Sequence, residues 1–339
     1  MPESLSAGGR YSGPGGFLLL DKPVGVSSFQ ALRPVKRAFP KAKVGHAGTL
    51  DPAASGLLIS GVASGTRLLE YLEGMPKTYA FTALFGFVSD TCDLEGRVEA
   101  YAGARPAASL CAEEVEGALA AFRGRIRQVP PAYSAIKVGG ERAYALARAG
   151  EVVELEARDV EVFELELKSF RPGSAESLET APQAELVMTC SKGTYVRSIV
   201  QDLGRALNIG AVTGTLRRLA IGPFRVENAS APESLSPASA LLPLETAVAA
   251  LPRVLIPDAD VARFLNGQSV RVALPAADPS RPATGADLSP PIATSFPASA
   301  EPADREVRAH ASDGRLLAIA ALGSDGLCGP RKVLAKGAT

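Results

Sequence analysis

The sequence has no tryptophan, and only two histidines and four cysteines among its 339 residues. The cysteines form no C-x-x-C pair, and two histidines are too few for most zinc sites. No stretch approaches the roughly 18 uncharged apolar residues needed to span a bilayer, and residues 1–16 lack the apolar segment of a secretory signal. These absences predict a reduced, cytoplasmic protein without a metal ion or a membrane anchor.

The sequence also has no net charge, because 36 basic side chains balance 36 acidic ones. The charges are nevertheless segregated along the chain. Residues 21–51 carry six basic and two acidic side chains, and residues 192–225 carry six basic and one acidic. In contrast, residues 151–185 carry ten acidic and three basic side chains. Such segregation indicates either one basic face that binds phosphate groups or separate solvated surfaces that never meet. Charge alone does not decide between the two.

The hydrophobic pattern predicts an α/β (α+β) body followed by a small β domain. The expected elements of the body are strands at 17–21, 79–88, 160–170 and 184–190, and helices at 29–39, 112–122 and 195–207. Ser27 or Ser28 is a candidate cap for the first helix, and Pro40 is expected to end it. Residues 44–56 are expected to form a glycine-rich loop.

The C-terminal part is expected to start with a helix-like segment at 244–252 and to continue as short strands. These strands are expected at 269–274, 306–311, 316–322 and 331–334, with turns at 312–314 and 324–326. Residues 275–303 are rich in Pro, Ala and Ser and are expected to be a disordered insertion. The predicted organisation is a flexible tail (1–16), a first domain (17–250) and a second domain (251–339).

The most informative segment is the loop VGHAGTLDPAASG, which contains Asp51. Pro52 restricts Asp51 to extended backbone geometry, so the short carboxylate is held on a stiff support. Taken alone, an aspartate before a proline is typical of a turn or a helix cap. The other candidates also have ordinary structural interpretations when they are taken alone. Arg197 is then a surface arginine, Tyr79 a packing residue and His46 a local hydrogen-bonding group.

Six segments, in order, change that interpretation. They are LDKPVGVS from Leu20, GHAGTLDPAASGL from Gly45, KTY from Lys77, PPAYSAIKVG from Pro130, SKGTYVR from Ser191 and LRRL from Leu216. Together they resemble the motifs of TruB-type tRNA pseudouridine synthases over roughly residues 17–226. The resemblance implies a pseudouridine-synthase fold: a central mixed, largely antiparallel sheet flanked by helices and loops. It also implies isomerisation of the uridine at position 55, in the T-loop of tRNA, without a cofactor.

The resemblance assigns expected roles to six residues. Asp51 is the expected catalytic carboxylate, and the expected substrate-binding residues are Tyr79, Arg197, His46, Tyr195 and Leu219. Arg197 supplies a cation beside Asp51, Tyr79 stacks on the target uracil with Leu219 in the same pocket, and His46 helps to hold the flipped nucleotide. Whether Tyr195 touches the substrate or only supports the pocket stays open, as does the choice between nucleophile and base for Asp51.

The C-terminal strands resemble a small PUA-like RNA-binding domain, with the segment DGR at Asp313 and the final PRKVL from Pro330. The expected partner is tRNA, and no protein partner or membrane is implied, so a monomer is expected. Two alternatives remain. One is an RNA-binding folding factor in which modification is secondary or lost. The other is a synthase that works with guide RNAs, although the chain lacks long basic extensions.

Overall fold

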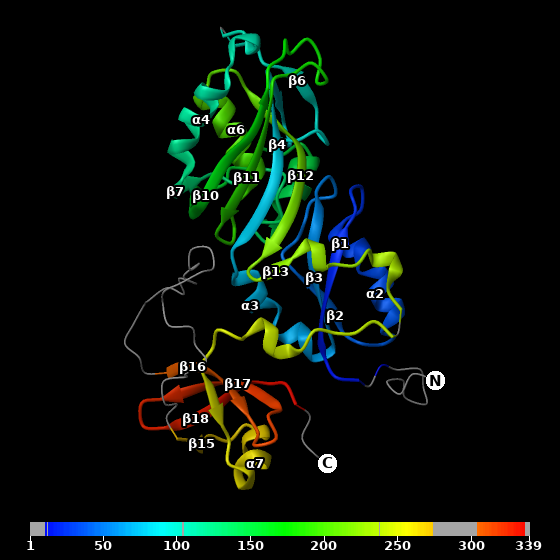
Figure 1. The fold of residues 1–339 in the computed structure, drawn as a ribbon, viewed down its shortest axis with the longest axis vertical. Helices are drawn as coiled ribbons and strands as arrows, with labels where there is room; N and C mark the ends of the chain where they lie inside the picture. Colours follow the sequence, from blue (N-terminus) through cyan, green and yellow to red (C-terminus); the bar gives the residue numbers. More distant parts are fainter. Residues whose placement is uncertain (1–10, 12, 104, 237, 274–303, 336–339) are drawn as a thin grey trace.

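The computed structural model describes residues 11, 13–103, 105–236, 238–273 and 304–335. The predicted insertion at 275–303 and most of the predicted tail at 1–16 lie outside these ranges. Within the described residues, a large sheet occupies the upper part of the molecule and a smaller sheet the lower part (Figure 1). Tyr11, inside the predicted tail, packs edge-on against Phe39 with ring centres 5.0 Å apart.

The large sheet has nine strands in the order β1-β3-β12-β4-β11-β10-β7, with β2 paired to β3 and β13 to β12. Its strands are β1 (Gly16–Lys22), β2 (Val44–Ala47), β3 (Ser55–Val62), β4 (Lys77–Phe85), β7 (Gly124–Gln128), β10 (Arg158–Arg171), β11 (Gln183–Cys190), β12 (Ala211–Ile221) and β13 (Phe224–Arg225). Only the β12–β3 pair is parallel among these described strands. The sheet is therefore mixed and largely antiparallel, as predicted.

Strand β12, which the hydrophobic pattern did not reveal, joins the two halves of this sheet. It pairs with β4 along most of its length and with β3 only at Arg217 and Arg218. Gly56 of β3 makes the second contact possible, because a Cβ atom there would lie 2.3 Å from the Arg218 carbonyl oxygen. Its φ of +101° is also one that other residues rarely adopt.

The helices are α1 (Ser28–Ala31), α2 (Arg33–Ala38), α3 (Leu69–Gly74), α4 (Ala112–Leu119), α5 (Ala143–Arg148), α6 (Val196–Ala206) and α7 (Val261–Leu265). Helices α4 and α6 lie together on one face of the large sheet (Figure 1). Ile199 and Leu203 of α6 are buried there, as the helical spacing predicts, against Phe81 and Leu186 of the sheet. The helix predicted at 112–122 is α4, extended by a 3-10 turn at Ala120–Phe122.

The helix predicted at 29–39 is two short helices. Ser27 caps α1 in a capping box, because its hydroxyl accepts a hydrogen bond from the Gln30 N–H while the Gln30 side chain accepts one from the Ser27 N–H. Pro34 then occupies the first turn of α2, where its missing N–H costs least, and a new helix begins there. The loop expected at 44–56 is also partly strand, because β2 pairs with β3.

Two other expectations need correction. The strand expected at 79–88 stops at Phe85, because Gly86 turns the chain with a φ of +93° before β5 (Phe87–Ser89) pairs with β6 (Val98–Ala100). The helix expected at 244–252 is only a 3-10 turn, Leu244–Ala247. Residues 248–250, which follow it, form a turn and not a helix.

The small sheet has five strands in the order β14-β16-β17-β18-β15. They are β14 (Arg253–Leu255), β15 (Val270–Arg271), β16 (Asp304–His310), β17 (Leu316–Gly323) and β18 (Leu327–Val333). Gly314 and Gly326 have positive φ values of 85° and 79°, at the two predicted turns. Phe264 of α7 lies in the core of this sheet with residues of β14, β16, β17 and β18. A further hairpin, β8 (Lys137–Val138) with β9 (Glu141–Arg142), lies apart from both sheets.

The two sheets share an apolar cluster. Leu316 and Ile319 of β17 are buried in the cluster that contains Phe17 of β1 and Leu72 of α3. Next to it, the Tyr71 hydroxyl donates a 2.7 Å hydrogen bond to Glu306 of β16. The small sheet is thus packed against the α3 side of the large one, and the domain boundary proposed near residue 250 stays a prediction.

Candidate active site

Asp51 lies in the connection between β2 and β3, at the wall of a cavity of about 1020 Å³. Its carboxylate is 39% exposed, so it is accessible from the cavity. The lining includes side chains of both charges as well as aromatic ones. They include Ser28, Phe29, His46, Thr49, Asp51, Asp90, Asp93, Glu95, Arg97, Tyr133, Arg142, Tyr144, Arg148 and Arg197.

Arg197 binds the Asp51 carboxylate directly. Its Nη2 lies 2.9 Å from Oδ2 of Asp51, and its Nε lies 3.7 Å from Oδ2 of Asp93. The same guanidinium donates to the carbonyl oxygens of Thr91 (2.8 Å) and Tyr133 (2.9 Å). The Arg197 side chain is only 5% exposed and is held on several sides. The structure therefore places the predicted cation beside the predicted carboxylate, in a fixed orientation.

The backbone on either side of Asp51 is held by buried polar side chains of the N-terminal segment. The Ser28 hydroxyl donates to the Leu50 carbonyl (2.9 Å) and accepts from the Leu50 N–H (2.8 Å). The Lys22 ammonium, which is fully buried, reaches the Pro52 carbonyl at 3.4 Å and also donates to the Val26 carbonyl. Burial lowers the pKa of Lys22 to about 8, and the negative charge of Asp51 opposes this shift.

Arg218 of β12 holds the loop from the other side. It is 1% exposed and donates to the carbonyl oxygens of Gly48 (2.9 Å) and Leu57 (2.7 Å). Buried donors and acceptors must be paired, so these contacts fix the ends of the loop as well as the arginine. The sequence showed Arg218 as a basic residue of the LRRL segment without a role of its own, because β12 was not recognised as an internal strand.

Asp93 is a second carboxylate beside Arg197, buried where Asp51 is partly exposed, and sequence reasoning missed it. It is 5% exposed, and its Oδ1 accepts hydrogen bonds from the Thr91 hydroxyl and the Glu95 N–H. Burial raises the pKa of Glu95, and the negative charges of Asp93 and Asp51 raise it further. The segment SDTCD has no periodicity, so only its concentration of polar residues after a strand could have drawn attention to it.

Tyr79 lies near the start of β4, opposite Arg218 of β12 and Met188 of β11. It is partly buried and packs against the core cluster that includes α6, and it is not among the residues that line the Asp51 cavity. Burial raises the pKa of the Tyr79 hydroxyl, while the Arg218 charge opposes the shift and the Asp51 charge adds to it. The phenol is therefore neutral and close to both charged groups.

Leu219 lies apart from Tyr79. It occupies an irregularity in β12, between the pairs Arg218–Tyr79 and Ala220–Thr78, and packs against the cluster shared by the two sheets. Leu216, earlier in the same strand, packs against the cluster that contacts Tyr79. Tyr79 and Leu216 thus pack against one cluster, and Leu219 packs against another. The irregularity has no signal in the sequence, so counting along LRRL could not distinguish the two leucines.

His46 and Tyr195 have different surroundings. His46 of β2 lines the cavity, with Nε2 3.4 Å from the Thr49 hydroxyl, and burial together with the Arg218 charge lowers its pKa. Tyr195 precedes α6 and exchanges two backbone hydrogen bonds with the Gln128 side chain, at 2.8 and 3.0 Å. Burial raises the pKa of the Tyr195 hydroxyl. Tyr195 is not among the residues that line the cavity.

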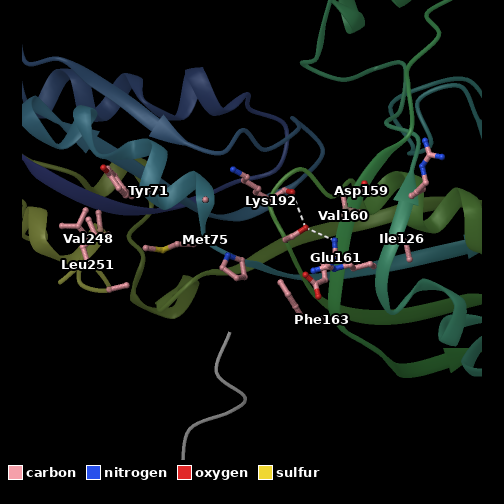
Figure 2. A pocket seen from close by; sticks show the side chains of 17 residues that line it. Tyr71, Met75, Ile126, Asp159, Val160, Glu161, Phe163, Lys192, Val248 and Leu251 are labelled. Carbon is pink, nitrogen blue, oxygen red and sulfur yellow. Dashed lines mark hydrogen bonds between the residues drawn. The ribbon is translucent and has the colours of Figure 1, made fainter. Parts of the chain in front are cut away.

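A second cavity, of about 580 Å³, lies between the end of α3, the β7–β10 edge of the large sheet and the segment before β14. Figure 2 shows its mainly apolar lining, with Met75, Val248 and Leu251 on one side and Ile126 and Phe163 on the other. None of the six predicted site residues is part of this lining. The predicted site is therefore associated with the Asp51 cavity alone.

Metal and membrane features were also considered within the described ranges. These residues contain no group of three or more His, Cys, Asp or Glu side chains that could hold a metal ion. In the same part of the chain, no helix has the length and apolar character needed to cross a membrane. All four cysteines are free.

Comparison with known proteins defines the family. Residues 36–196 match the model of the TruB family pseudouridylate synthase, N-terminal domain. The "tRNA pseudouridine synthase B" of Nitrobacter winogradskyi is 41% identical, over 75% of this chain and 71% of the relative. The protein of the same name from Aquifex aeolicus is 40% identical, over 76% of this chain and 87% of the relative. The chain therefore belongs to the TruB family of pseudouridylate synthases.

A solved structure extends the likeness to the whole fold. The chain is similar to one in the crystal structure of a Cbf5-Nop10-Gar1 complex, with a TM-score of 0.63, 21% identity and coverage of 94% of this chain and 85% of the other. At this identity the likeness concerns the fold alone. It confirms the predicted pseudouridine-synthase fold, and the C-terminal sheet is consistent with the predicted PUA-like domain.

Proposed function

We propose that this protein isomerises uridine to pseudouridine at position 55, in the T-loop of tRNA, with Asp51 as the catalytic carboxylate. The observation that carries the proposal is the Asp51–Arg197 ion pair, 2.9 Å long, at the wall of an open cavity of about 1020 Å³. Such a cavity has room for a flipped nucleotide. The relatives' name, tRNA pseudouridine synthase B, supports tRNA as the substrate.

The reaction explains why a carboxylate is sufficient. The N1–C1′ bond of uridine breaks, the uracil turns, and C5 bonds to C1′, while C5 releases its proton to solvent and N1 takes up a proton. Atoms and oxidation state are conserved, so the isomerisation has no need of a cofactor. Asp51 acts as a nucleophile at C1′ or as a base at C2′. Both routes need the carboxylate in a defined position, which the contact with Arg197 provides.

The remaining residues are assigned to holding the RNA. Extruding a stacked base costs a few kcal/mol, and stacking on an aromatic ring returns about 1–3 kcal/mol. We assign this stacking to Tyr79, which lies opposite Arg218 in the β4–β12 pair. His46 contacts the flipped conformation from the cavity wall, Tyr195 supports the start of α6, and Leu219 supports the far end of β12. The C-terminal sheet is assigned a further RNA contact.

The direct test is Asp51→Asn, assayed by tritium release from tRNA that carries [5-³H]uridine. The variant keeps the size of the side chain and removes the charge, so tRNA binding is expected to persist while tritium release falls below detection. Asp202→Asn is the matched control, because Asp202 also pairs with an arginine at 3.0 Å but lies on the outer face of α6. Measurable turnover by Asp51→Asn would reject the assignment.

The same variant separates the alternatives. If a folding role is important, Asp51→Asn restores growth to a strain without the enzyme even though its tRNA carries no pseudouridine. A guide-dependent enzyme would leave a purified tRNA transcript unmodified when no other RNA is present. Mapping pseudouridines in total RNA, with and without the protein, identifies the position. Loss of pseudouridine at any position other than 55 would change the assigned target.

A further inference from the structure

Two aromatic side chains stand out at the mouth of the Asp51 cavity. Among the described residues, Phe29 (63% exposed) and Tyr144 (42%) are the aromatic members of the set of exposed large hydrophobic side chains, and both line this cavity. A single exposed apolar side chain is ordinary on a protein surface. Two exposed rings at one cavity are a pattern that points to a flat ligand.

Each of these rings carries a basic side chain. The Lys36 ammonium lies 4.4 Å from the centre of the Phe29 ring, and the Arg148 guanidinium carbon lies 5.7 Å from the Tyr144 ring. Rings that stack on bases next to cations that meet phosphates are the usual means of binding unpaired nucleotides. The two pairs come from different parts of the chain, α1–α2 and α5, and each contributes its ring to the lining of the cavity.

The Phe29 ring is rigidly linked to the catalytic loop. Its neighbour Ser28 is buried and makes both hydrogen bonds to Leu50, the residue before Asp51. The capping box between Ser27 and Gln30 fixes the turn on which Phe29 stands. Consequently the ring has a defined place relative to Asp51 although most of its surface faces solvent.

The surface behind the ring is basic. Helix α2 exposes Arg33, Lys36 and Arg37 and contains no carboxylate. A phosphate of the nucleotide on the ring would meet these cations. A protein partner with an apolar anchor would have no use for so concentrated a basic helix, so RNA fits the surface better.

We propose that Phe29, together with Lys36, is a second base-stacking platform, which takes an unpaired RNA nucleotide next to the target uridine. The proposal rests on the proposed function, since it assumes an RNA substrate in the Asp51 cavity. It differs from the role of Tyr79, which concerns the target base itself. The platform determines how firmly the substrate is held, and leaves the chemical step to Asp51.

The absence of tryptophan from the sequence provides a clean probe. Phe29→Trp places a sole indole on the platform, and titration with a T-loop stem-loop RNA is expected to quench its fluorescence through base stacking. Phe163→Trp is the matched control, because Phe163 is a partly buried phenylalanine of the second cavity (Figure 2). Quenching at position 29 but not at 163 supports the platform. Equal quenching at both positions, or none at position 29, overturns it.

Kinetics give a second, independent reading. Phe29→Leu keeps an apolar side chain without the aromatic face, and is expected to raise KM for the stem-loop about tenfold while kcat stays within about twofold. Phe29→Tyr is expected to restore the original KM. An unchanged KM for Phe29→Leu, or a fall in kcat alone, contradicts the proposal.

The two proposals fail in different ways. Fluorescence quenching requires no turnover and can be repeated in the Asp51→Asn background. If Phe29→Trp is quenched but the wild-type protein forms no pseudouridine, the proposed function is overturned and the platform is kept. Tritium release with no quenching at position 29 would overturn the platform alone.

Discussion

The two cavities of this protein differ in what holds their walls. Around Asp51, the wall is a loop whose backbone is bound by buried polar side chains from distant segments: Ser28, Lys22 and Arg218. Around the second cavity, apolar side chains such as Met75, Val248 and Leu251 line one side, and the β7–β10 edge contributes both apolar and charged side chains. Apolar contacts have no preferred direction, whereas hydrogen bonds fix both distance and angle.

This difference indicates which cavity is suited to chemistry. A reacting carboxylate must be kept within a fraction of an ångström of its productive position, and buried hydrogen bonds supply that precision. The following predictions test the comparison, from the largest expected effect to the smallest.

Removing Arg197 is expected to have the largest effect. Arg197→Met leaves Asp51 and the buried Asp93 without their shared cation, so turnover is expected to fall at least about a thousandfold, and the free energy of unfolding by about 3–5 kcal/mol. Tritium release and urea denaturation measure the two losses. Arg205→Met, on the same helix, removes an exposed ion pair and is expected to cost less than about 1 kcal/mol. Comparable losses in both variants would contradict the assigned role.

Removing Arg218 is expected to have a smaller effect, because it acts through the loop. Arg218→Met leaves the Gly48 and Leu57 carbonyls without a donor, at about 1–3 kcal/mol each. Turnover is expected to fall about a hundredfold because the carboxylate is displaced. Arg217→Met is the neighbouring control, since Arg217 pairs with Asp21 near the surface. If the two variants have equal turnover, the loop does not depend on Arg218.

The buried Lys22 is expected to make the free energy of unfolding depend on pH. Burial lowers the pKa of Lys22 to about 8 in the folded chain, whereas lysines of the unfolded chain titrate near 10.4. As the pH rises, the folded chain therefore loses the Lys22 proton first. Between these pH values the unfolded state binds more protons, so the free energy of unfolding rises with pH. The urea midpoints of wild type and Lys22→Met are compared at pH 7 and at pH 9.5. The midpoint of the wild type is expected to rise relative to that of the variant at the higher pH. A constant difference would contradict it.

Changing the second cavity is expected to have the smallest effect on turnover. Leu251→Ala removes an apolar contact beside Val248, and should lower the free energy of unfolding by about 1–2 kcal/mol. Turnover at saturating tRNA is expected to stay within about twofold of wild type. Thermal unfolding and tritium release give the two values. A large loss of turnover would show that the two cavities are coupled.

Much of this architecture could be predicted from the sequence, because periodicity reports burial. Helix α6 and strands β10 and β11 were predicted within a few residues, since each has one regular apolar face. The helix expected at 244–252 was wrong, because apolar residues there pack between the sheets without a helical backbone. Strand β12 was missed because its buried Arg218 breaks the apolar pattern of an internal strand.

The site was predicted unevenly for a related reason. Asp51 and Arg197 were identified through ordered motifs, and the structure brings them within 2.9 Å. Asp93 and the loop contacts of Lys22 and Arg218 could not be derived, because they join segments far apart in the chain. Leu219 and Leu216 could not be told apart without the irregularity in β12.

The position of β12 also has a consequence for the order in which the protein is made. The strand lies between β3 and β4, and its Arg218 holds the loop that precedes β3. During synthesis from the N-terminus, the Asp51 segment is complete long before residue 218 is available. Contacts of such sequence separation form late, since closing a long loop is costly. A nascent chain that ends before β12 is therefore expected to contain the carboxylate without an organised site, and catalytic competence arises only when β12 is inserted into the large sheet.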